Sequence, residues 1–230
     1  MDRQVYSVMI RDVSSLAVHR TILVVDVEGF ADHRRSNLDQ VAVRAGLYRA
    51  MQKAFHTAGI SWTDCDHEDR GDGVLVLARA DVPKSLFVDA LPNALVEALH
   101  AHNGTYRVEA RIRLRMALHA GEINYDPHGV TAAAVNLAFR LLEADPLKAA
   151  LGHSSGVLAM ITSSWFFDEV VRHSRACNPA AYRPVSVAVK ETTTTGWIHL
   201  PGGPASTGLL SSASTTDLSP VGRTRRVWDQ

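Results

Sequence analysis

The 230-residue sequence has little cysteine and no long apolar run. Its two cysteines, Cys65 and Cys177, stand far apart, and neither belongs to a CxxC pair or a cluster with histidine. We therefore expect free thiols and neither a disulfide framework nor a zinc site. No apolar stretch approaches the roughly 20 residues that cross a bilayer, and the polar N-terminus does not resemble a signal peptide. These absences predict a cytoplasmic protein without membrane insertion.

Neither sign of charge predominates, because 24 basic residues balance 24 acidic ones. Without a basic excess, a nucleic-acid partner is not expected. The sequence also lacks a GxxxxGK[ST] P-loop, a GxGxxG dinucleotide motif and a GxSxG nucleophile elbow. P-loop hydrolysis, dinucleotide binding and serine hydrolysis are therefore not indicated.

Extended and helical patterns are mixed along the chain. A β-branched apolar run at 21–25 predicts a buried strand, and apolar spacing at 37–57 predicts an amphipathic helix that ends near Gly59. Two extended runs around Gly71-Asp72-Gly73 predict a hairpin. The other predicted elements are helices at 83–102, 130–149 (which Pro146 would shorten) and 163–173, and strands at 111–119, 156–161, 182–190 and 196–200.

This order predicts an α+β fold, a sandwich with a ferredoxin-like βαββαβ centre. In the strand at 111–119, apolar residues alternate with arginines, which predicts one buried and one exposed face. From Pro201 the sequence is rich in Gly, Ser, Thr and Pro. We therefore expect an N-terminal segment at 1–18, one folded domain at 19–201 and a flexible tail at 202–230.

Two aspartates stand at the ends of predicted strands. Asp26 follows the apolar run TILVV, and Asp72 lies at the tip of the predicted hairpin. Side by side, the two carboxylates could bind a pair of hard divalent cations about 3.5–4 Å apart. Backbone groups from Val27 to Phe30 could contact metal and phosphate. Either aspartate alone would be interpreted as a turn residue.

Four motifs strengthen the metal hypothesis: ILVVDVEGF, EDRGDGVLVLA, RLRMALHAGEI and VNLAFRLLEA. In sequence and order they resemble the motifs of class III adenylate and guanylate cyclases, and together they span about residues 22–144. YRPVSVAVKE is a weaker match to the closing strands. The resemblance implies that 19–201 is a catalytic domain that makes a 3′,5′-cyclic nucleotide and pyrophosphate from a nucleoside triphosphate. It also implies two Mn²⁺ or Mg²⁺ ions per site.

The resemblance assigns roles residue by residue. Asp26 and Asp72 match the metal ligands, and Val27 matches the residue whose carbonyl joins one metal. Asn136 matches the residue that orients the ribose, and Arg140 matches the cation that stabilises the α-phosphate. Asn136 and Arg140 are four residues apart and share a helix face, and an arginine fork suits phosphate. Alone, Arg140 would be interpreted as part of a surface ion pair.

In this family each site is shared between subunits. The resemblance therefore implies a homodimer with two sites at its interface. Asp26 and Asp72 of one subunit would face the second subunit's copies of Asn136 and Arg140. Nearby, His119 could be interpreted as a general base, but we expect a structural histidine because two-metal chemistry needs no side-chain base.

Two positions bear on which nucleobase the protein selects. The family selects purines through the residue four before the second aspartate, here Glu68, and the residue three before the asparagine, here Ala133. Glu68 can accept hydrogen bonds from guanine, uracil or cytosine but cannot donate one to adenine N1, and Ala133 offers no polar contact. Adenine is therefore disfavoured.

The stretches RAGLYRAM, AGISW and DRGDG resemble the bacterial pyrimidine cyclases of Pycsar anti-phage systems. The segment at 121–136 departs from the class III pattern: it is shorter than usual, and we expect it to lack the family's extra Gly-rich hairpin. The resemblance implies that Tyr48 contacts the base, although it could simply pack on its helix. It further implies that the substrate is UTP, narrowly favoured over CTP. A separate effector would respond to the cyclic nucleotide. Alternatives are a guanylate cyclase, a non-catalytic nucleotide-sensing domain of this fold and, less favoured, a polymerase-like palm domain.

Overall fold

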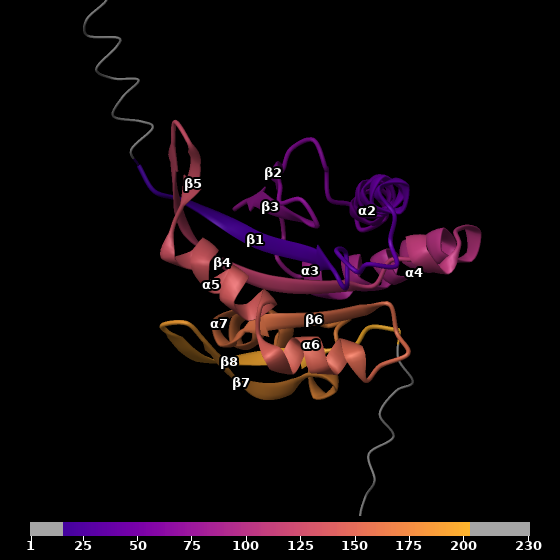
Figure 1. Ribbon diagram of the computed structural model, residues 1–230. Helices are drawn as coiled ribbons and strands as arrows, with labels where there is room; N and C mark the ends of the chain where they lie inside the picture. The colour runs from indigo at the N-terminus through magenta and orange to yellow at the C-terminus, as the bar shows by residue number, and fades with distance from the viewer. Residues whose placement is uncertain (1–15, 203–230) are drawn as a thin grey trace, which may run out of the picture.

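The computed structural model describes residues 16–202, so most of the predicted N-terminal segment and almost all of the predicted tail lie outside it. Its mixed sheet has the strand order β2-β3-β1-β4-β6-β8-β7, with β5 paired to β4 (Figure 1). Only β4 and β6 pair in parallel among these strands. The strands are β1 (Val18–Val27), β2 (Asp66–Asp69), β3 (Gly73–Arg79), β4 (Leu114–Asp126), β5 (Gly129–Thr131), β6 (Leu158–Ser163), β7 (Arg183–Val189) and β8 (Thr192–His199).

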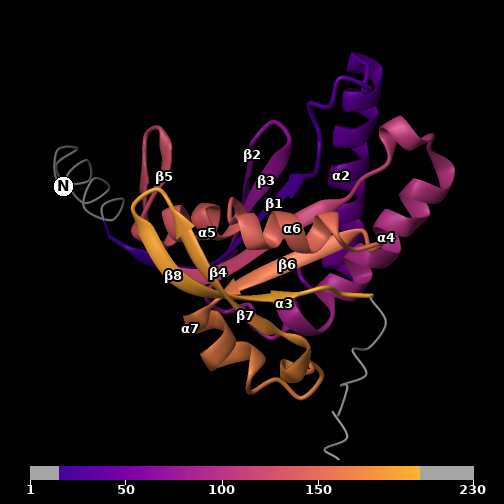
Figure 2. The same ribbon diagram turned by 60° about the horizontal axis from the view of Figure 1, so that its bottom comes forward.

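Helices cover both faces of the sheet. Residues of α2 and α4 form one apolar core with the sheet, and residues of α5 and α6 form a second core on the opposite face (Figure 2). The helical elements are α2 (Asn37–Thr57), α3 (Leu86–Asp89), α4 (Leu91–Thr105), 3-10 Val108–Ala110, α5 (Ala133–Leu142), α6 (Asp145–Gly152), α7 (Ser164–Phe166), π-helix Phe167–Val171 and 3-10 Pro179–Ala181.

The centre of the fold is ferredoxin-like, as predicted. It runs β1, α2, β2, β3, α4, β4, and its strands lie in the order β2-β3-β1-β4. Strand β1 contributes Leu23 and Val25 to the core under α2 and α4, and Ile22 and Val24 to the core under α5 and α6. Burial on both faces explains why its sequence is continuously apolar.

Helix α2 has the predicted bounds because both ends are defined locally. At its start, Ser36 and Asp39 form a capping box, and Arg107 also pairs with Asp39 at 2.6 Å. At its end, Gly59 takes a positive φ of 74°, which favours glycine. The capped start fixes where the loop after β1 enters the helix.

Several predicted boundaries were wrong. The helix predicted at 83–102 is divided at Ala90 into α3 and α4. The helix predicted at 130–149 is also two helices, and Pro146 lies in the first turn of α6 instead of ending a helix. Strand β4 extends to Asp126 and forms a hairpin with β5, which the sequence did not predict; the expectation that 121–136 lacks the family's extra Gly-rich hairpin stays a prediction.

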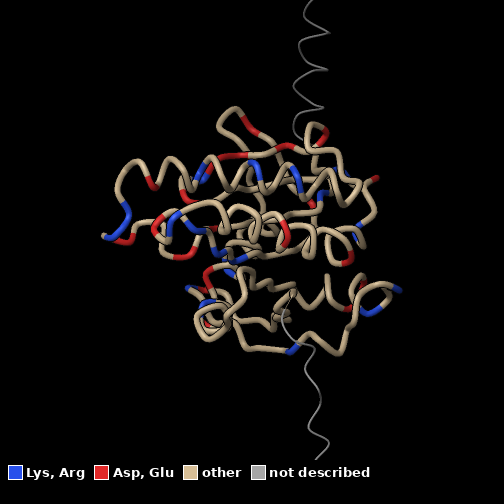
Figure 3. The backbone as a smooth tube through the Cα atoms, turned by 90° about the vertical axis from the view of Figure 1, so that its right-hand side faces the viewer, with Lys and Arg blue, Asp and Glu red and all other residues tan. Residues whose placement is uncertain are grey.

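Other expectations concern surface and thiols. Cys65 and Cys177 are both free, as predicted. Within residues 16–202, no helix is both long and apolar enough to cross a membrane. Basic and acidic residues are interspersed along the backbone face shown in Figure 3, in keeping with the balanced composition.

Candidate active site

The end of β1 and the tip of the β2–β3 hairpin lie side by side. The β1–β3 register pairs Asp26 with Gly73, and the Val27 N–H donates to the carbonyl of Asp72 at 2.9 Å. A Cβ at Gly73 would lie 2.1 Å from the carbonyl oxygen of Val25, so this close approach requires glycine. The structure thus brings together Asp26, Val27 and Asp72, the three predicted metal-site residues.

Arg115 holds Asp26, an interaction that the sequence did not predict. The Arg115 Nε and Nη2 donate to the two carboxylate oxygens at 2.8 and 2.7 Å. The Arg115 and Asp26 side chains are only 16% and 19% exposed, so Arg115 is covered, contrary to expectation. Burial raises the pKa of Asp26, Arg115 opposes this rise, and the nearby charge of Asp72 adds to it.

The donor set fits a hard divalent cation. Two carboxylates and the Val27 carbonyl are oxygen ligands of the kind that Mg²⁺ and Mn²⁺ accept. Among the described residues there is no group of three or more His, Cys, Asp or Glu that could hold a metal. Water or substrate phosphate would therefore complete the coordination, as is common for Mg²⁺.

A second network, which we call the turn clasp, holds the loop that carries Asp72. Asp69 accepts hydrogen bonds from the Tyr48 hydroxyl at 2.7 Å and the Gly71 N–H at 2.8 Å. Arg44 donates to both the Asp69 carboxylate and the Gly71 carbonyl. These donors, Tyr48 foremost, lower the pKa of Asp69 to about 2. The Tyr48 hydroxyl is therefore engaged in positioning the turn.

Replacing Tyr48 with Phe should weaken this clasp. Because the hydrogen bond is partly exposed, we expect the free energy of unfolding to fall by about 1 kcal/mol. The Asp69 contribution to stability should be present above the ordinary pKa of aspartate and be lost as the pH falls towards about 2. Urea denaturation at several pH values measures both effects. A base contact made by the hydroxyl would instead change KM selectively for one nucleotide, without altering stability.

The predicted base-recognition residues lie around the β2–β3 hairpin and the start of α5. Glu68 pairs with Arg70 at 2.6 Å, and the Arg70 guanidinium lies over the Phe139 ring, 5.4 Å from its centroid. Ala133 is exposed at the first position of α5. Phe30 is half-buried and packs against the core under α2 and α4. Glu68 is thus anchored by a neighbour, with its carboxylate partly exposed.

Asn136 and Arg140 lie on α5. Arg140 is mostly buried and pairs with Glu191 at 3.3 Å and with Glu143 at 3.7 Å. Asn136 is exposed. None of the ion pairs or hydrogen bonds described for Arg140 is to Asp26 or Asp72. Within one chain, these contacts therefore do not join the aspartates of the predicted site to Arg140.

His119 has the features of a structural histidine. Its Nδ1 lies 2.8 Å from the hydroxyl of Ser163, which also accepts a hydrogen bond from the Phe166 N–H. Burial lowers the pKa of His119 to about 4. A pKa this low makes the imidazole a weak base, and the structural role of His119 stays a prediction.

The fold is that of class III adenylyl and guanylyl cyclase catalytic domains. The matching solved structures include the guanylyl cyclase Cya2, with a TM-score of 0.57 and 18% identity over 84% of this chain and 97% of that chain. The adenylate/guanylate cyclase/hydrolase from Silicibacter pomeroyi matches with a TM-score of 0.57 and 19% identity, over 81% of this chain and 99% of the matching chain. The adenylyl cyclase CyaB from P. aeruginosa matches with a TM-score of 0.53 and 13% identity, over 80% of this chain and 93% of the matching chain. No family model and no curated protein matches the chain.

Proposed function

We propose that this protein is a pyrimidine nucleotide cyclase that converts UTP, and less readily CTP, into the 3′,5′-cyclic nucleotide and pyrophosphate. The observation that carries the proposal is the pairing of β1 with the hairpin, which sets Asp26 beside the Asp72 turn in a cyclase fold. Two oxygen-donor side chains at one strand end are what a two-metal site requires. The turn clasp supports the same role, since it fixes the conformation of the loop that carries one ligand.

Asp26, Asp72 and the Val27 carbonyl would hold two Mn²⁺ or Mg²⁺ ions. Bound there, the ions would lower the pKa of the ribose 3′-hydroxyl and neutralise the triphosphate. Arg115 would contribute when Asp26 turns to the cation, because its freed guanidinium could then donate to phosphate oxygens. Its low exposure would make that interaction stronger than one in water.

The remaining groups would come from a second subunit, which makes the active form a homodimer. Asn136 and Arg140 share one helix, and the described contacts of Arg140 do not include the two aspartates of its own chain. In a dimer, Asn136 would orient the ribose, and Arg140 would stabilise the charge that develops on the α-phosphate. Glu191 and Glu143 would hold Arg140 until substrate binds.

Base selection would depend on Glu68 and Ala133. A partly exposed carboxylate at Glu68 can accept hydrogen bonds from the N–H groups of uracil or cytosine and would reject adenine N1. Tyr48 would line the base through its ring, since its hydroxyl is held by Asp69. We place the product in anti-phage signalling in the cytoplasm, where a separate effector would respond to it.

Incubation with each of the four ribonucleoside triphosphates and Mn²⁺ tests the proposal. We expect cyclic UMP to be the main product, with less cyclic CMP and little cyclic AMP, as measured by liquid chromatography and mass spectrometry. Dominant cyclic GMP would identify a guanylate cyclase, which Glu68 also suits. No product from any of the four would favour a non-catalytic nucleotide-sensing domain.

A further inference from the structure

The paired ends of β1 and β4 carry a ladder of arginines and carboxylates. Arg115 pairs with Asp26 at 2.7 Å, and Arg113 pairs with Glu28 at 2.8 Å. The third arginine of the same alternating run, Arg111, has no acidic partner. Within the described part of the chain, no hydrogen bond or ion pair involves the Arg111 guanidinium, so the ladder ends on an uncompensated cation.

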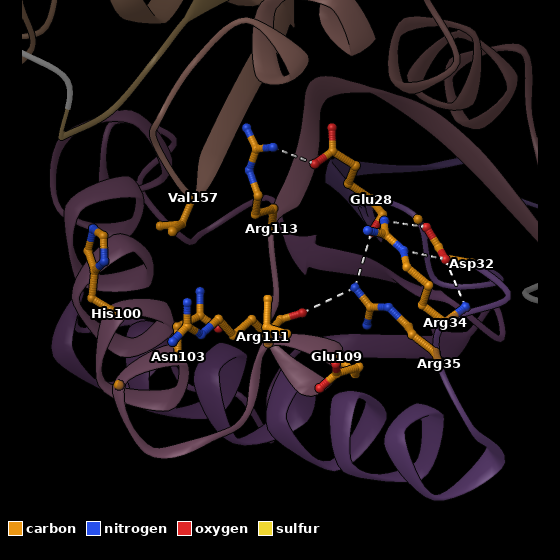
Figure 4. Close-up of a pocket in the computed structure, with 13 residues that line it drawn as sticks. Glu28, Asp32, Arg34, Arg35, His100, Asn103, Glu109, Arg111, Arg113 and Val157 are labelled. Carbon is orange, nitrogen blue, oxygen red and sulfur yellow. Dashed lines mark hydrogen bonds and ion pairs between the residues drawn. The ribbon is translucent and has the colours of Figure 1, made fainter.

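Beyond this last arginine the structure contains a pocket with a volume of about 800 Å³. The loop between β1 and α2, helix α4 and the segment before β4 form its walls, and Figure 4 shows Arg111 extending towards the α4 wall. This volume is in the usual range for small-molecule sites, about 300–1,000 Å³. Asp26, Asp72 and Arg115 are not among its lining residues, so the pocket is distinct from the proposed metal site.

Charge in the pocket is unbalanced towards cations. Four arginines but only three carboxylates line it, and each carboxylate is already paired: Asp32 with Arg34, Glu28 with Arg113, and Glu109 with Arg107, which lies outside the pocket. Neither Arg35 nor Arg111 has an ion pair within residues 16–202.

Arg35 has donor capacity left. Its Nη2 donates to the carbonyls of Glu28 and Arg111 at 3.4 and 3.1 Å, and its Nη1 is buried without a hydrogen-bond partner. A buried donor without an acceptor is destabilising. Burial also lowers the pKa of Arg35. The nearby carboxylates of Asp32 and Asp39 oppose this fall, and an anion bound in the pocket would add a further negative charge beside the guanidinium.

We propose that this pocket binds a small anion that bears one or two phosphate groups, with Arg111 as its main contact and Arg35 as a supporting charge. Guanidinium forks match phosphate oxygens, and phosphate supplies the counter-charge that the ladder lacks. Glu28 and Gly29 line the pocket and directly follow Asp26 and Val27. Occupancy would therefore restrain the strand end that carries the metal ligand, a regulatory consequence that rests on the proposed cyclase function.

Titration calorimetry with pyrophosphate and with inorganic phosphate tests the binding. The full chain is used without nucleotide, with metals removed by a chelator and at constant ionic strength. We expect saturable binding that Arg111→Gln weakens by about tenfold or more, since it removes a charge-assisted contact. Arg111 is exposed, and its guanidinium makes no hydrogen bond or ion pair among the described residues, so this substitution should leave the fold intact.

Two matched variants remove the same charge elsewhere. Arg175→Gln alters an exposed arginine that does not line the pocket, and Arg140→Gln alters the proposed active site. Both should bind the anions as the unmodified chain does. Equal weakening in all three variants, weakening only in Arg140→Gln, or no saturable binding would overturn the proposal. Because the assay needs neither metal nor turnover, these outcomes are independent of whether the protein is a cyclase.

Discussion

Asp72→Asn should reduce cyclic nucleotide formation by at least about a thousandfold, since metal ions contribute several kcal/mol of transition-state stabilisation. Asparagine keeps the shape of the side chain but loses the charge that a divalent cation requires. Asp72 is exposed at the tip of the hairpin, and its carbonyl bond to the Val27 N–H does not involve the side chain. Product formation with saturating Mn²⁺ measures the loss, and circular dichroism checks the fold.

Asp64→Asn is the matched control for this variant. It removes one carboxylate from the exposed loop before β2, close in sequence to the hairpin but outside the proposed site. We expect its turnover to equal that of the unmodified protein. Full turnover in Asp72→Asn would reject the metal assignment, and an equal loss in both variants would point to a general effect of charge.

Two inactive variants should restore activity when combined. Asp72→Asn disables the metal half of the site, and Arg140→Gln disables the phosphate half. If these halves come from different subunits, a mixed dimer contains one intact site. With random pairing, half of the dimers are mixed, so co-expression should recover about a quarter of the activity of the unmodified dimer.

Co-expression of Asp26→Asn with Asp72→Asn is the control, because both substitutions affect the same half and no pairing creates an intact site. It should remain inactive. If Asp72→Asn and Arg140→Gln together are also inactive while differently tagged copies of the two variants co-purify as mixed dimers, the halves are not shared between subunits. High activity of Arg140→Gln alone would remove Arg140 from the mechanism.

The parts of the fold that could be predicted from the sequence are those with strong local patterns. The run at 21–25 was recognised because it is continuously apolar and β-branched, and the helix at 37–57 because its apolar spacing and Gly59 agree. The hairpin at Gly71-Asp72-Gly73 has its own turn signal. These elements carry both predicted metal ligands, which explains why the site could be outlined before the structure.

The break between α5 and α6 was missed for a local reason. Apolar residues continue through 130–149, so the pattern alone gives no end at Leu142. Pro146 was interpreted as a terminator, although proline is equally suited to the first turn of a helix. The β4–β5 hairpin was missed because a three-residue strand has too few residues to show a period.

Contacts across strands could not be predicted at all. Arg115 meets Asp26, 89 residues away, only because of the β1–β4 register. All three alternating arginines were assigned to solvent, although Arg115 is mostly covered, because one sequence does not reveal which part of a strand face the helices cover. Tyr48 and Asp69 likewise meet because a helix turn and a hairpin edge are adjacent in space.

The bond between Arg115 and Asp26 places a positive charge where the proposed metal site would hold a cation. In the absence of divalent ions, the guanidinium neutralises a poorly hydrated acid beside a second acid, so the empty domain avoids the repulsion that two adjacent carboxylates would create. In the proposed cyclase, a divalent cation would compete with this guanidinium for Asp26. The concentration of free manganese or magnesium at which such a domain becomes active would then depend partly on Arg115, a residue that is not itself a ligand.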